Sequence, residues 1–148
     1  MKAVIQKSLE ASVEVDGKIV GQIAQGLVVL LGITHDDTNK DLEYILDKLI
    51  NMRLFEDNDK YFEKSILETS KNILLISQFT LYAGTKKGRR PDFINAAKSE
   101  VAKPIYEKFI QRLKDSRINV QTGEFGAEMK VKLTNHGPVT IILDSSEK

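Results

Sequence analysis

The first part of the chain alternates apolar and polar positions in the way that is typical of β-strands. Residues 3–6 and 11–15 have the pattern of extended segments. Asp16-Gly17, which follows them, is a dipeptide favoured in two-residue hairpin turns. We therefore expect residues 18–23 to return as the second strand of a hairpin.

Two longer apolar runs predict strands at the centre of a sheet. Residues 27–33 are apolar throughout and rich in branched side chains, as expected of a strand buried on both faces. Residues 72–83 form a second long strand candidate, and a polar loop over residues 84–91 follows it. Pro91 is suited to opening a short helical segment after that loop.

Helical periodicity appears in two places. Thr38 is an expected N-cap, and Asp41 would lie in the first turn of the helix that follows. Pro104 is expected in the first turn of a second helix, which should end near Asp115. The apolar stripes of the two helices are Leu42, Ile45, Leu46, Leu49 and Ile50, and Ile105, Phe109, Ile110 and Leu113.

The last part of the chain predicts three short strands, at residues 119–122, 128–133 and 139–143. Gly137-Pro138 stands between the last two. Proline has no amide hydrogen for a sheet, so this dipeptide predicts a turn, an edge or a bulge. The pattern alone does not say whether the turn has any role beyond joining strands.

Together these elements predict a single α+β domain over residues 1–148, with a mixed or antiparallel, barrel-like sheet and two main helices packed outside. A chain of 148 residues buries about 70% of its unfolded surface. The net charge is only +1, so contacts with nucleic acid or membrane would need local clusters of charge. Cysteine is absent, and no apolar run has the length of a signal peptide or a membrane span. We expect a soluble cytoplasmic protein without membrane contact.

Polar side chains interrupt the second buried strand at Ser77, Gln78 and Thr80. They either bond to neighbouring backbone or form the floor of an active site, because buried polar groups need partners. Thr80 as a nucleophile would need an adjacent base. The two histidines, His35 and His136, have no spacing that places either beside it, so a Ser/His/Asp triad is unsupported.

A basic loop follows that strand. It places four positive charges in five positions around Gly88: Lys86, Lys87, Arg89 and Arg90. Such a loop is suited to binding phosphates, and it is equally typical of a solvated surface. If it binds RNA, each neutralised phosphate should contribute roughly 0.7 to 0.9 to the salt slope.

Metal and cofactor chemistry is not predicted. Two distant histidines without cysteine do not form a typical zinc site. The stretch "HDDTNKD" lacks the spacing of an EF-hand loop, and "GTKKG" is too short for a phosphate-binding P-loop. We expect neither a metal nor a cofactor.

Several motifs together resemble the D-aminoacyl-tRNA deacylase family. They are "SQFTLYA", "KKGRRPDF" and "TGEFGAEMKVKLTNHGPVTIILDS", with "MKAVIQKSLEASVEVDGK", "GLVVLLGI" and "NMRLFED" in the same order as in that family. The paired motifs SQ-x-T and N-x-GP-x-T are specific. The resemblance implies a homodimer with a barrel-like sheet, without metal or cofactor. It also implies hydrolysis of the ester between a D-amino acid and the 3′-terminal adenosine of tRNA.

The resemblance assigns the two motifs to two walls of one site at the subunit interface. The Gly137-Pro138 bond would be cis, and this dipeptide would reach into the partner's pocket, where its carbonyls exclude an L side chain. Glycine mischarged on tRNA would be accepted. The segment Ser77, Gln78, Phe79 and Thr80 would form the other wall, with main-chain N–H near Phe79 as the oxyanion donor.

The resemblance also assigns binding roles and exposes two departures, at Lys7 and in the segment "YFEKS" over residues 61–65, where the family more commonly has an Asn-containing segment. Phe125 and Met129 would line the adenine pocket, and Asn135 would hold the turn. The acceptor stem would contact Lys86, Lys87, Arg89 and Arg90. Lys7 stands where many members have arginine, and His136 occupies a variable position and is not expected to be catalytic. A catalytically silent RNA-binding module and an editing module for a particular L-amino acid are the alternatives.

Overall fold

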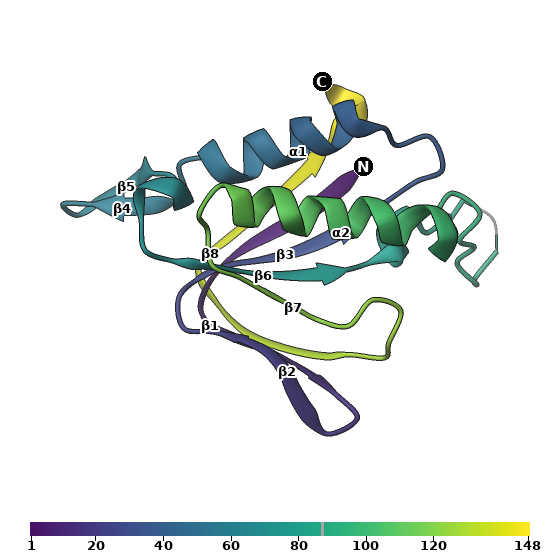
Figure 1. The fold of residues 1–148 in the computed structure, drawn as a ribbon, viewed down its shortest axis with the longest axis horizontal. Coiled ribbons are helices and arrows are strands. Elements are labelled where there is room, and N and C mark those ends of the chain that lie inside the picture. The colour runs from purple at the N-terminus through teal and green to yellow at the C-terminus, as the bar shows by residue number, and fades with distance from the viewer. Residues whose placement is uncertain (87) are drawn as a thin grey trace.

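The computed structural model describes residues 1–86 and 88–148, which form one domain around a six-stranded mixed sheet (Figure 1). β1 (Lys2–Val15) is the spine of the sheet and pairs antiparallel with β2, β3 and β8. The two predicted segments, 3–6 and 11–15, are parts of this one strand. Its regular pairing with β8 is interrupted between Ser8 and Ala11, where the alternation of the sequence also breaks.

Different strands pair with different parts of β1. β3 (Gly26–Gly32) pairs with its first half, and β2 (Lys18–Ile23) pairs with its second half. The β1–β2 hairpin turns at Asp16-Gly17 as predicted, and both residues have positive φ, at 48° and 77°. β8 (Lys130–Asp144) runs along the other edge of β1 from end to end.

The remaining strands of the sheet are parallel. β6 (Asn72–Ser77) pairs with β3, and β7 (Val120–Thr122) pairs with β6. The sheet then curls until β7 lies against β2, where a Cβ on Gly21 would stand 2.6 Å from the carbonyl oxygen of Thr122. The sheet is therefore a nearly closed barrel, and glycine permits the close approach at its seam.

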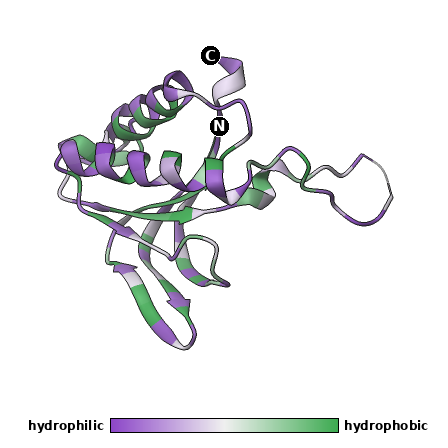
Figure 2. Cartoon of the chain, turned by 45° about the vertical axis from the view of Figure 1, so that its right-hand side comes forward, coloured by the Kyte–Doolittle hydropathy of each residue, from purple (hydrophilic) through white to green (hydrophobic). Residues whose placement is uncertain are grey.

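Two helices, α1 (Asn39–Asn51) and α2 (Ser99–Asp115), cover one face of the sheet (Figure 1). Hydrophilic and hydrophobic residues alternate around both helices, as expected when one face of each is buried (Figure 2). The main core lies between helices and sheet and includes Ile5, Leu31, Leu42, Ile45, Leu49, Leu75, Phe109 and Leu113. A smaller cluster, which includes Val13, Val28, Leu74 and Ile76, fills the inside of the barrel.

A small hairpin stands apart from the main sheet. β4 (Phe55–Asp57) and β5 (Lys60–Lys64) pair only with each other in the topology of the described residues, and a turn at residues 58–59 joins them. Figure 1 shows the hairpin projecting at one end of the molecule, beyond the end of α1. The short 3₁₀ helices are η1 (Ile66–Glu68), η2 (Phe79–Tyr82) and η3 (Ser145–Glu147). In the described part of the chain, no helix is long and apolar enough to cross a membrane.

The strand predicted over residues 72–83 is shorter than expected. β6 ends at Ser77, and η2 replaces its second half. The neighbouring strand β3 ends at Gly32, so residues beyond Gln78 have no parallel partner to continue the ladder. An apolar pattern cannot show where the neighbouring strand stops.

The prolines before and within α2 do not have the predicted positions. Pro91 opens no helix, because the adjacent Asp92 forms an antiparallel bridge with Gly84. Helix α2 begins at Ser99, so Pro104 lies inside it and not in its first turn. The missing N–H of Pro104 leaves the carbonyl of Glu100, in the first turn, without its usual helical donor. The predicted end near Asp115 is confirmed.

The Gly137-Pro138 segment is not a turn between two strands. Residues 128–133 and 139–143 belong largely to one strand, β8, and both parts pair with β1 in the same direction. The register passes from Asn135 opposite Ser8 to Thr140 opposite Gln6, so the four residues 136–139 face Lys7 alone. We call residues 136–139 the Gly-Pro bulge. A β-bulge with extra residues resolves the conflict between proline and sheet.

The N-terminus of α1 supplies a test of the fold. Thr38 caps the helix as predicted: its hydroxyl accepts from the N–H of Lys40, while its own N–H donates to the carboxylate of Asp41, 2.9 Å away. Replacing Thr38 by alanine should lower the free energy of unfolding by about 1 kcal/mol, because one N–H loses its acceptor. Urea denaturation measures the change. Lys40→Ala, in the same turn, is the control and should differ little from wild type; equal losses in both variants would contradict the role of the cap.

Candidate functional site

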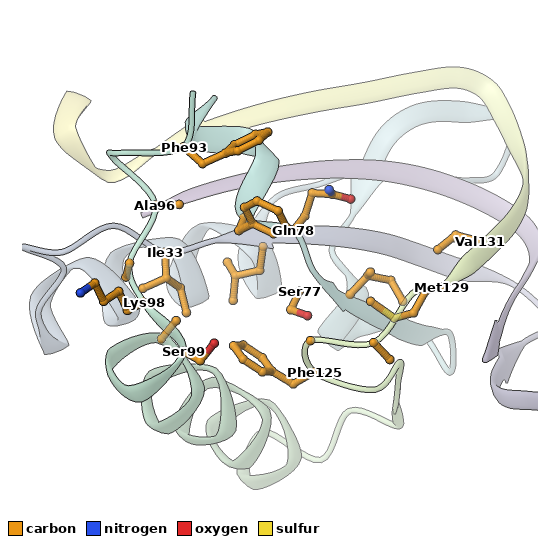
Figure 3. Close-up of a pocket in the computed structure, with 17 residues that line it drawn as sticks. Ile33, Ser77, Gln78, Phe93, Ala96, Lys98, Ser99, Phe125, Met129 and Val131 are labelled. Atoms are coloured by element: carbon orange, nitrogen blue, oxygen red, sulfur yellow. The ribbon is translucent and has the colours of Figure 1, made fainter. Parts of the chain in front are cut away.

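A cavity of about 520 Å³ opens at the carboxyl ends of the parallel strands (Figure 3). Ile33 follows β3, Ser77 ends β6, and residues 123–129 follow β7. The start of α2 closes the opposite side. Ligands of parallel sheets bind outside these strand ends, where loops diverge from a rigid edge. The topology therefore selects this cavity as the candidate binding site.

The floor of the cavity is the transition from β6 to η2. Ser77 pairs with Leu31, and the N–H of Gln78 donates to the carbonyl of Leu31 at 2.8 Å. The chain then turns into η2, whose first residue is Phe79. The first N–H groups of a helix have no acceptor within it, so the N–H of Phe79 is left without a helical partner. Ser77, Gln78 and Phe79 all line the cavity.

Thr80 lies beyond this floor. Its side chain is exposed, and its hydroxyl accepts a short hydrogen bond from the side-chain amide of Gln78. Within residues 1–86 and 88–148, the hydrogen bonds of Thr80 include none to a histidine or carboxylate that could act as a base. The arrangement lacks the adjacent base that a threonine nucleophile needs.

Apolar side chains form the walls. The Phe125 ring packs against Tyr106 with centroids 5.5 Å apart, and Tyr106 donates to the carbonyl of Leu75 at 3.0 Å. Met129 faces the same space, and a Cβ on Gly123 would collide with its sulfur. Glycine at position 123 therefore leaves room for the Met129 side chain, which lines the cavity. The sequence pattern did not point to Gly123, because its importance comes from a neighbour that only the fold supplies.

The rim contains residues that the sequence did not single out. Phe93 packs edge-to-face against Phe79, with centroids 5.0 Å apart, and both rings are exposed. Lys98 and Ser99 stand at the start of α2 and also line the cavity (Figure 3). The sequence pattern does not select them, because it places Pro104 in the first turn of that helix, whereas the helix begins at Ser99. A signal was available for Phe93, since it ends the "KKGRRPDF" motif.

The basic loop lies beside this rim and is closed at its base. Gly84 and Asp92 exchange two backbone hydrogen bonds, of 2.8 and 3.0 Å. The loop therefore leaves and returns at one point beside Phe93. Three of the predicted basic residues, Lys86, Arg89 and Arg90, are exposed on it, and the fourth, Lys87, lies outside the described residues.

The segment after the loop is tied to the end of β3. The hydroxyl of Thr34 donates to the carbonyl of Asn95 at 2.6 Å, and a ring nitrogen of His35 lies 2.8 Å from the carbonyl of Ile94. His35 thus contacts the backbone that carries the rim, and its hydrogen bonds among the described residues include none to Thr80. Its role in the structure is to hold this segment in place.

The Gly-Pro bulge is bridged by one side chain. Asn135 accepts from the N–H of Val139 at 2.9 Å and donates to the hydroxyl of Thr140 at 3.0 Å. Gly137 and Pro138 are exposed above this bridge. The Gly137-Pro138 peptide bond is cis, which confirms that part of the prediction. Gly137 has a φ of +134°, which L side chains rarely adopt.

The fold does not bring the bulge to the cavity of the same chain. The bulge faces Lys7, which pairs with Leu27 near the start of β3, whereas Ser77 pairs with Leu31 near its end. These positions are about 13 Å apart along the strand, and three strand spacings add about 14 Å sideways. The two specific motifs therefore occupy separate places on one chain.

Acidic and histidine side chains do not gather at the cavity. In the part of the chain that the structure describes, no group of three or more His, Cys, Asp or Glu side chains could hold a metal ion. The polar groups available at the cavity are those of Ser77, Gln78, Lys98 and Ser99, together with main-chain N–H groups. Such a site can bind and polarise a substrate through hydrogen bonds.

Known proteins are similar to this chain in sequence and fold. Residues 4–144 match the family described as D-Tyr-tRNA(Tyr) deacylase. A protein named D-aminoacyl-tRNA deacylase from Clostridium botulinum (strain Eklund 17B / Type B) is 54% identical over 147 residues, which cover 99% of each chain. A solved structure named c-Myc DNA Unwinding Element Binding Protein is 42% identical, with a TM-score of 0.91 over 97% of this chain and 98% of that one.

A second solved structure, of a probable eukaryotic D-amino acid tRNA deacylase, is 18% identical and has a TM-score of 0.84 over 96% of this chain and 97% of that one. At this identity the likeness concerns the fold, and it includes the nearly closed sheet with two helices. The family match and the 54% identity cover nearly the whole chain. The chain belongs to the D-Tyr-tRNA(Tyr) deacylase family.

Proposed function

We propose that this protein hydrolyses the ester that joins a D-amino acid to the 3′-terminal adenosine of tRNA, and that it does so as a homodimer. Family membership supports the reaction. The observation that carries the detailed mechanism is the separation of the two motifs: an exposed, bridged Gly-Pro bulge and a cavity floor at Ser77–Phe79 lie too far apart on one chain to act together. A second copy can bring its bulge to the cavity of the first.

The cavity suits the adenosine end of the substrate. Its volume of about 520 Å³ is within the range of sites for small ligands. Phe125 and Met129 offer apolar surfaces to the adenine, while Ser77 and Gln78 offer polar groups to the ribose. The N–H of Phe79 would donate to the oxyanion that forms when water attacks the ester carbonyl. The ester is already labile and the ribose 2′-OH lies beside it, so no protein base is required.

Selection between enantiomers would come from exclusion. The carbonyls of Gly137 and Pro138 of a second copy would face the α-carbon of the substrate, where an L side chain would collide with main chain. Rejecting the wrong enantiomer by about 10⁴-fold requires about 5.5 kcal/mol, more than a lost methylene supplies but reasonable for a steric clash. Glycine has no side chain to collide and would be hydrolysed as well. Such an enzyme would serve quality control of translation.

The reaction itself is tested with matched substrates. In the presence of a chelator, the protein should hydrolyse D-Tyr-tRNA and Gly-tRNA and leave L-Tyr-tRNA intact, because selection depends on the α-carbon. Release of the labelled amino acid measures each rate. Equal rates for both enantiomers would indicate an editing module without chirality. Binding of tRNA without any turnover would indicate a silent RNA-binding module.

The cross-subunit arrangement is tested by complementation. Gly137→Val should disable the bulge, and Ala127→Trp should fill the cavity, so each homodimer alone should be inactive. Mixing the two and allowing subunits to exchange should restore about a quarter of wild-type activity, because half of the dimers in a twofold assembly then hold one intact site. Sedimentation checks that both variants remain dimeric. A site built within one chain would show no recovery.

Replacing Thr80 distinguishes catalysis by main chain and substrate from catalysis by a threonine nucleophile. Thr80→Ala should retain substantial activity, within about tenfold of wild type, because main chain and substrate would provide the catalysis. Single-turnover hydrolysis of D-Tyr-tRNA measures the effect. Loss of activity to the uncatalysed background would show that Thr80 is the nucleophile.

The basic loop should govern affinity for tRNA. Replacing Arg89 and Arg90 by alanine should weaken binding and lower the slope of log K against log salt by roughly 1.4 to 1.8, because two phosphate contacts are lost. The ratio of D to L hydrolysis should stay the same. The control replaces Lys18 and Lys114, two exposed lysines away from the cavity, and should leave the slope unchanged. An equal effect in the control would point to overall charge.

A further inference from the structure

A buried lysine lies directly beneath the Gly-Pro bulge. Lys7 is only 6% exposed, and it is the residue of β1 that faces residues 136–139. It points to the helix side of the sheet, as do Ala3 and Ile5, which belong to the main core. A buried ammonium is costly unless it is paired and hydrogen-bonded. Its partner therefore matters for the shape of this part of the sheet.

The partner comes from outside the sheet. The ammonium of Lys7 donates to the carboxylate of Glu56 at 2.5 Å, and it lies 5.8 Å from the centre of the Phe55 ring. Both residues belong to β4, in the small hairpin that pairs with no strand of the main sheet in the described topology. Glu56 thus connects a separate element to the single position of β1 that faces the bulge.

The charges agree with this geometry. The hydrogen bond from Lys7 is the main reason why the pKa of Glu56 lies below its usual value, and a backbone hydrogen bond adds to it. Burial acts in the opposite direction. The positive charge of Lys7 lowers the pKa further.

Within the bulge, Val139 packs its half-buried side chain against the main core, whereas residues 136–138 are exposed. The ends of the bulge are held by Asn135 and by the pairs that flank it, at Ser8 and Gln6. Between these ends, four residues stand opposite one, and the side chain of that one residue is held by Glu56. If the carboxylate is removed, the buried ammonium has to move towards water, and the surface beneath the bulge changes.

We propose that Glu56 is a positioning residue for Gly137 and Pro138: through Lys7 it sets the orientation of the bulge and hence the discrimination between D and L substrates. This inference rests on the proposed function, in which the bulge selects the enantiomer. It assigns enantiomer selection partly to an acidic side chain on the β4–β5 hairpin.

The test compares Glu56→Gln with a matched control on the same hairpin. Asp57 forms a similar pair with Lys64 at 2.8 Å, but the Lys64 side chain is 38% exposed, whereas that of Lys7 is 7% exposed. In Glu56→Gln, the ratio of kcat/KM for D-Tyr-tRNA to that for L-Tyr-tRNA should fall about 10- to 100-fold, as expected when a selecting group is displaced by about 1 Å. The ratio for Asp57→Asn should equal that of wild type.

A purely structural pair gives a different pattern. It would lower both rates in parallel and leave their ratio unchanged, or it would affect Asp57→Asn and Glu56→Gln alike; either result overturns the proposal. If Glu56→Gln does not fold, Glu56→Asp keeps the charge and shortens the side chain, and its ratio should fall less steeply but measurably. An unchanged ratio in Glu56→Asp would then also overturn it. Wild-type protein that is inactive on D-Tyr-tRNA would instead refute the proposed function.

Discussion

The antiparallel ladder between β1 and β8 is the interaction on which the rest of the structure depends. It runs from Lys2 opposite Asp144 to Glu14 opposite Lys130, and it resumes in the same direction after the Gly-Pro bulge. Because the bulge is anchored to one strand at both ends, it projects from the sheet without being a flexible loop. A hairpin turn at the same place would have reversed the chain and separated the two flanks.

The same strand also fixes where the cavity can form. β1 carries β3 on its first half, β3 carries β6, and β6 carries β7, so the parallel strands end together on the side away from the bulge. Their carboxyl ends leave space that the start of α2 and residues 123–129 enclose. The pairing along β1 thus places the Gly-Pro bulge and the cavity at separate positions of the chain's surface. This separation is the reason for proposing that a second copy completes the site.

Buried polar groups occur on β1 where its regular pairing breaks. Ser8, 3% exposed, donates to the carbonyl of Glu10 at 2.6 Å and lies 3.2 Å from that of Thr134, and Lys7 is neutralised by Glu56. Where the ladder is interrupted, backbone carbonyl and N–H groups lose their partners in the neighbouring strand. Side chains such as that of Ser8 can form hydrogen bonds with these groups instead. No buried side-chain polar atom among the described residues lacks a partner. The irregular part of β1 is therefore stabilised by side-chain hydrogen bonds and by the Lys7–Glu56 ion pair.

The sequence by itself determined the elements whose signals are local. The hairpin at Asp16-Gly17, the capping box at Thr38 and the buried strand after Gly26 depend on neighbours within a few residues, so their patterns were sufficient. Motif resemblance also marked Ser77–Thr80 and Gly137-Pro138. Only the tertiary structure decided that β6 stops at Ser77, that the Gly-Pro segment is a bulge, and that Glu56 reaches Lys7. These features depend on where a neighbouring strand ends or which distant side chain arrives, and no local pattern carries that information.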